Sequence, residues 1–112
     1  MTRSTRFTAR CLATTTVLLC LSAAPAKNAK PVKVTIDDLK YNPAKVTIAV
    51  GQTVQWINKD DHDHTVVAKN EDFDSENLGR DDTFKYTFTK AGKFEYFCRY
   101  HPRMKGLVIV EE

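Results

Sequence analysis

Cys98, His101 and Met104 lie three residues apart near the C-terminus, in a C-x-x-H-x-x-M run. Outside residues 1–26, Cys98 is the only cysteine and Met104 the only methionine. A thiolate, an imidazole and a thioether are ligands that suit one soft, thiophilic metal ion, and copper fits this set best. The run therefore predicts three ligands of one copper site, whose fourth ligand must come from another segment.

The candidate for the fourth ligand is His64, which follows an acidic loop (residues 60–63) and opens an apolar segment (residues 65–67). His62 is the nearest competitor, because it lies two residues away and on the same face if the segment is extended. We assign His64 as the ligand. We expect His62 to be a solvated loop residue, with Asp60 or Asp61 as its partner.

Alternation of apolar and polar residues predicts the strands that position these ligands. The segments with this pattern, together with an apolar segment near the C-terminus, are residues 32–36, 46–50, 53–58, 65–68, 84–88, 94–98 and 107–110. No stretch shows a sustained helical period, and seven or eight short strands with frequent turns indicate an all-β antiparallel sandwich or barrel.

The same alternation predicts which side chains point inward. Cys98 shares a face with Phe94 and Tyr96, so we expect it to point inward at the end of its strand. The expected core consists of the large aromatic residues of the strands, namely Trp56, Phe84, Phe88, Phe94 and Tyr96.

Residues 1–26 have the features of an export signal that is cleaved. Residues 1–10 contain three arginines and no acidic residue, and residues 11–24 are mostly apolar. Residues 24–26 (Ala-Pro-Ala) form a small-x-small cleavage pattern. The apolar stretch is shorter than the roughly 20 residues that span a membrane, although an uncleaved anchor is the alternative. We divide the chain into a signal peptide (residues 1–26) and one domain (residues 27–112), with no stable membrane insertion after cleavage.

The charges of the domain balance once the signal is set aside. Three of the 17 Lys and Arg residues lie within positions 1–26, whereas all 14 Asp and Glu residues lie beyond them. The domain is therefore formally neutral, and without a basic cluster that contains aromatic residues no nucleic-acid partner is expected.

A lone cysteine in an exported domain is a free thiol, an intermolecular bridge or a metal ligand.

Several motifs follow one another in an order known from one family. They are Trp56-Ile57-Asn58, His64-Thr65-Val66, Tyr86-Thr87-Phe88, residues 92–98, His101-Pro102 and Met104-Lys105-Gly106. In this order the chain resembles the cupredoxins, the small blue copper proteins of the plastocyanin and azurin family, over residues 31–112. The gap between His101 and Met104 is most similar to that of amicyanins, since plastocyanins and pseudoazurins have a longer one.

The resemblance implies a Greek-key sandwich that holds one type 1 copper ion. By position, His64, Cys98 and His101 would be the equatorial ligands and Met104 the weak axial ligand. It also implies a one-electron carrier rather than an enzyme, working in the periplasm between exported redox proteins such as a dehydrogenase and a cytochrome c. We expect a monomer.

The electron would pass through the exposed edge of His101, the port that the family uses. We expect Phe97, Tyr100 and Pro102 to form an apolar rim around it. Arg99 and Arg103 place positive charge nearby, which predicts attraction to an acidic partner surface.

Two residues depart from the family pattern. Many relatives have Asn after the first histidine, where this chain has Thr65, and Thr or Ser after the cysteine, where it has Arg99. Those positions usually tie the two ligand loops together by hydrogen bonds. We therefore expect a weaker tie between the loops here.

The sequence fits other functions less well than that of an electron carrier. A periplasmic copper-binding protein for storage, delivery or sensing is the main alternative, but such proteins use several exchangeable Met or His ligands. A nucleophile pair of Cys98 and His101 lacks a third, orienting group. Zinc could take the same ligands but does not favour the thioether of Met104. A metal-free adhesion sandwich would leave the ligand run as a coincidence.

Overall fold

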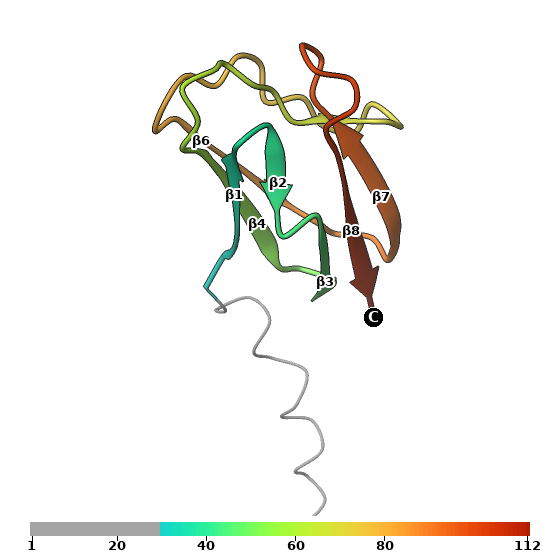
Figure 1. The fold of residues 1–112 in the computed structure, drawn as a ribbon. Helices are drawn as coiled ribbons and strands as arrows, with labels where there is room; N and C mark the ends of the chain where they lie inside the picture. The colour runs from blue at the N-terminus through green and yellow to red at the C-terminus, as the bar shows by residue number, and fades with distance from the viewer. Residues whose placement is uncertain (1–29) are drawn as a thin grey trace, which may run out of the picture.

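The computed structural model describes residues 30–112, so the predicted signal segment lies outside the described residues. Two four-stranded sheets face each other (Figure 1). Their strands are β1 (Val32–Asp37), β2 (Lys40–Asn42), β3 (Lys45–Ala49), β4 (Thr53–Asn58), β5 (Val67–Ala68), β6 (Thr83–Thr87), β7 (Gly92–Phe97) and β8 (Lys105–Glu111). The predicted all-β sandwich with seven or eight strands is confirmed. None of the described residues belongs to a helix long and apolar enough to cross a membrane.

The strand order is β2-β1-β4-β6 in one sheet and β3-β8-β7-β5 in the other. Four of the strand pairs are antiparallel, as predicted, but β1 pairs with β4 and β3 pairs with β8 in parallel. Both sheets are therefore mixed. The residue pattern does not reveal this, because period-2 alternation is the same for strands of either direction.

Two strands differ from their predicted extent. The sequence pattern missed β2, which has only three residues and buries only Tyr41. The strand predicted at residues 65–68 is reduced to β5, because the preceding backbone pairs with another loop instead. There His64 and Leu78 exchange two backbone hydrogen bonds, of 3.1 and 2.8 Å.

The core lies between the sheets around Trp56, which is fully buried. Its ring stands edge-on to Tyr96, with the ring centres 5.3 Å apart. The predicted core residues Phe88 and Tyr96 are also buried, while Phe84 and Phe94 pack against the core from its edge. Each such side chain stabilises the fold by about 1.5–3 kcal/mol on full burial. The core therefore gives the loops at its end a rigid support.

The loops that follow β4 and β7 lie at the end of the sandwich opposite the C-terminus (Figure 1). His64 belongs to the first of these loops. Cys98, His101 and Met104 belong to the second, because β7 ends at Phe97 and β8 begins at Lys105. The fold thus brings together two segments that are far apart in the sequence.

Candidate metal centre

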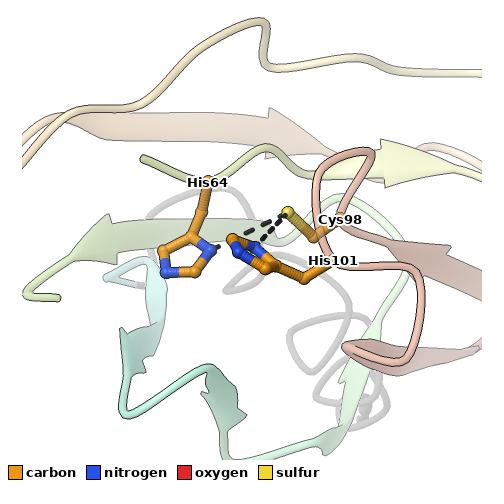
Figure 2. A group of neighbouring side chains, drawn as sticks. All are labelled: His64, Cys98 and His101. Atoms are coloured by element: carbon orange, nitrogen blue, oxygen red, sulfur yellow. Dashed lines mark hydrogen bonds between the residues drawn. The ribbon is translucent and has the colours of Figure 1, made fainter. Parts of the chain in front are cut away.

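Three of the four predicted ligands meet at this end of the sandwich. One ligand atom each of His64, Cys98 and His101 lies within 4.8 Å of the others, and among the described residues no other group of His, Cys, Asp or Glu side chains gathers in this way. Figure 2 shows the two imidazole rings side by side, with a nitrogen of each near the sulfur. The Nδ1 atoms of His64 and His101 lie 3.8 and 3.7 Å from Sγ of Cys98.

These separations suit atoms that share one metal ion. Thiolate sulfur and imidazole nitrogen bind a metal at about 2.3 Å and about 2.0–2.1 Å, which places two such ligands about 3.5–3.8 Å apart at tetrahedral to trigonal angles. The observed distances fall in this range. A set of two imidazoles and one thiolate is also the donor chemistry that copper prefers. The residues therefore fit a single copper ion.

The orientation of the His64 ring is set by Asp60. The Nε2–H of His64 donates to Oδ2 of Asp60 at 2.9 Å, which leaves Nδ1 free to face Cys98. Burial raises the pKa of the Asp60 carboxyl, but the hydrogen bond from His64 and three further hydrogen bonds lower it by more, so the pKa lies well below its usual range. A carboxylate behind an imidazole fixes the ring and makes it a better ligand.

This role of Asp60 was not predicted from the sequence, and neither was the role of Asn58. The Asn58 side chain is fully buried, and its Nδ2 donates to the backbone carbonyls of His62 and Leu78 while its Oδ1 accepts from the Asp60 N–H. The side-chain amide of Asn58 therefore holds three backbone groups of the loops around His64 in place. An Asn at the end of a strand, followed by Asp two residues later, was the available signal.

Replacing Asp60 with alanine should lower the free energy of unfolding by about 2–3 kcal/mol, because the buried Nε2–H of His64 and the N–H of Leu39 would lose their acceptor. Urea denaturation of the metal-free protein measures the change. Asp61→Ala is the matched control, since it removes only an exposed ion pair with Arg80 and should cost less than about 1 kcal/mol. Equal losses in both variants would contradict this role of Asp60.

The second ligand loop is closed by its own backbone. The N–H of Cys98 donates to the carbonyl of Met104 at 3.2 Å, and the N–H of Met104 donates to the carbonyl of His101 at 2.8 Å. The Met104 side chain is buried, and with His101 it lines a hollow at the surface. The tight turn therefore keeps all three residues of the C-x-x-H-x-x-M run at one end of the sandwich.

The prediction of a weaker tie between the two ligand loops was wrong. The hydroxyl of Thr65 accepts a 2.8 Å hydrogen bond from the N–H of Arg99, and the N–H of Thr65 donates to Sγ of Cys98 at 3.4 Å. In addition, the buried hydroxyl of Tyr41 in β2 donates to the carbonyl of Thr65 at 2.7 Å, which anchors the first ligand loop to the sheet. A threonine hydroxyl and a backbone N–H thus join the two ligand loops.

His62 lies where the sequence analysis expected it. Its side chain is 62% exposed, and its Nδ1 lies 3.5 Å from Oδ1 of Asp60. His64 is fully buried and His101 is half-buried. Of the two competing histidines, only His64 directs a ring nitrogen at Cys98.

The surface around His101 differs in two respects from the predicted one. The hollow beside His101 is lined by apolar and basic residues, namely Leu39, Tyr100, Pro102, Arg103 and Met104. Phe97 does not take part in it and lines another hollow instead. In addition, Arg99 forms an ion pair with Asp74, so its charge is partly neutralised and Arg103 is the positive charge next to the hollow.

Comparison with known proteins agrees with the fold and the site. A family model described as a cupredoxin-like domain matches residues 10–110. Amicyanin from Paracoccus versutus is 42% identical over 94 residues, which cover 80% of this chain and 71% of that protein. Amicyanin from Paracoccus denitrificans is 34% identical over 83 residues, which cover 70% of this chain and 63% of that protein.

Solved structures of amicyanins have a similar fold. The crystal structure of amicyanin from Paracoccus versutus aligns with a TM-score of 0.68 and 42% sequence identity. The alignment covers 74% of this chain and 83% of that protein. The fold of this chain is therefore similar to that of an amicyanin.

Proposed function

This chain belongs to the family of cupredoxin-like domains, and from this premise we propose that its metal centre shuttles electrons between exported redox proteins. The chain is a one-electron carrier with a type 1 copper site, and it is not an enzyme. The meeting of His64, Cys98 and His101 around one point is the observation that carries this function. When bound, copper supplies a metal that alternates between the Cu(I) and Cu(II) states.

The proposed ligands are His64, Cys98 and His101, with Met104 as the weak axial ligand. The spacing of the three donor atoms and the burial of the Met104 side chain support this assignment. The hydrogen bond from Thr65 to Sγ would stabilise negative charge on the sulfur. Because Asp60 and the closed second loop hold the side chains in place, little has to rearrange when an electron arrives or leaves.

The proposed port for electrons is the edge of His101, within the hollow that Tyr100 and Pro102 help to line. An apolar surface lets a partner approach closely without leaving polar groups unpaired. Arg103 at the margin of the hollow favours a partner with acidic residues around its own redox group. We propose a dehydrogenase as donor and a cytochrome c as acceptor, in the periplasm, with this chain acting as a monomer after removal of residues 1–26.

Placing a negative charge at the port should slow electron transfer to an acidic partner. The variant Pro102→Glu adds this charge beside His101 and should reduce the second-order rate constant by about tenfold at low ionic strength, with a smaller effect at high salt. Stopped-flow oxidation of the reduced protein by an acidic cytochrome c measures the rate. Ala91→Glu, exposed at the other end of the sandwich, is the control that should transfer normally. Unchanged rates in Pro102→Glu would indicate another port.

The carrier function itself is tested by voltammetry and by self-exchange. We expect a reversible one-electron wave and fast electron exchange between the Cu(I) and Cu(II) forms, because the ligands are held rigidly. A protein for copper storage or delivery would instead lose copper rapidly to a chelator and show no reversible wave. That result would overturn the proposed function.

A further inference from the structure

A third imidazole stands beside the two proposed histidine ligands. The ring centre of His62 lies 6.1 Å from that of His101 and 6.4 Å from that of His64. His62 is exposed, whereas the side chains of His64 and Cys98 are fully buried. The three histidines therefore form a series from solvent to the interior of the site, and the ligands at its inner end are the least accessible.

The residue that orients His64 also contacts His62. The two carboxylate oxygens of Asp60 contact one ring each: Oδ1 lies 3.5 Å from Nδ1 of His62, and Oδ2 lies 2.9 Å from Nε2 of His64. Within residues 30–112, no hydrogen bond involves Nε2 of His62, so this nitrogen is available to a metal ion. A carboxylate on the opposite ring nitrogen is the usual support of a metal-binding histidine.

The rings are close enough together for one ion to contact two of them. An imidazole centre lies about 3.2 Å from a metal bound to one of its nitrogens, so two rings that share an ion have centres up to about 6.4 Å apart. The separation of His62 and His101 lies within this limit, and that of His64 and His101, 5.0 Å, lies well within it. An ion on His62 could therefore contact the next ring before it leaves the first.

We propose that His62 is a capture ligand, through which copper enters and leaves the centre formed by His64, Cys98 and His101. The inference rests on the proposed function, since it requires a copper site at those residues. Copper binds first to Nε2 of His62 and then exchanges this nitrogen for the ligands of the site. The ion keeps its charge throughout, and the thiol proton of Cys98 passes to solvent as the thiolate binds.

The proposal predicts a change in rates without a change in the end state. In His62→Ala, the copper-loaded protein should have the spectrum and the affinity of the parent, because His62 is not a ligand of the filled site. Uptake of Cu(II) by the metal-free protein should slow by at least about tenfold, which corresponds to about 1.4 kcal/mol of lost stabilisation in the transition state for entry. Release of copper to a chelator should slow by the same factor, since a residue that assists entry also assists exit.

Stopped-flow absorption at the thiolate-to-copper band measures both rates in the full chain. Asp61→Asn is the matched control, because it removes a negative charge from the same loop and leaves the imidazole in place. Equal uptake rates in His62→Ala and the parent would overturn the proposal. It would also be wrong if Asp61→Asn slowed uptake as much as His62→Ala, since attraction by the acidic loop would then set the rate. A parent protein without the band would instead refute the copper site itself.

Discussion

Replacing Gly106 with alanine should destabilise the fold by at least about 3 kcal/mol, the upper part of the range for overpacked cores. Gly106 lies in β8 directly opposite Tyr96 of β7. A Cβ atom on Gly106 would lie 2.6 Å from Cε2 of the Tyr96 ring and closer still to its Cζ and Oη. The ring cannot give way, because Tyr96 is buried between Tyr41 and Trp56.

Chemical denaturation of the metal-free protein tests this expectation. Gly79→Ala is the matched control, since its Cβ would lie 3.4 Å from Asp82, an ordinary contact, and should cost less than about 1 kcal/mol. A double-mutant cycle locates the cause: in a Tyr96→Leu background, Gly106→Ala should cost much less than in the parent. A full cost in that background would show that the clash with Tyr96 is not the reason.

Replacing His64 with alanine should lower the affinity for copper by more than about 100-fold, because even the partners behind a ligand contribute about 10–100-fold. It should also abolish the blue colour. His64 is the fully buried histidine of its loop, and its Nδ1 faces Cys98. Titration of the metal-free protein with copper, followed by visible absorption, measures both quantities.

His62→Ala is the control for this variant, because it removes the other histidine of the same loop. Its copper complex should keep the colour of the parent. If His62→Ala lost the colour and His64→Ala kept it, the ligand assignment would have to move to His62. We expect the colour to be kept in His62→Ala, because His62 is exposed and its Nδ1 is directed toward Asp60.

The position of Cys98 could be predicted from the sequence, because it depends on a short-range pattern. Alternation along β7 places Tyr96 and Cys98 on one face, and both are buried. The partner loop was harder to predict, since His62 and His64 would share a face in an extended segment, whereas in the fold His62 is exposed and His64 is buried. The backbone of His64 pairs with Leu78, and its Nδ1 faces Cys98, and no local pattern reveals these long-range contacts.

The tie between the ligand loops could not be predicted because it involves long-range contacts. Thr65 and Arg99 are separated by 34 residues, and their hydrogen bond uses the backbone of Arg99, whose side chain therefore does not matter for it. Tyr41 lies on a strand too short to show alternation, yet its hydroxyl holds the carbonyl of Thr65. The residue types at positions 65 and 99 suggested that the hydrogen bonds between the loops are lost, whereas the fold forms other hydrogen bonds in their place.

The most direct test of the copper centre is the visible absorption spectrum of the copper-loaded protein, measured beside Cys98→Ser. The arrangement of His64, Cys98 and His101 around one point predicts an intense thiolate-to-copper band in the parent and none in the variant. A colourless Cu(II) complex of the parent would contradict it, and so would a band that survives in Cys98→Ser.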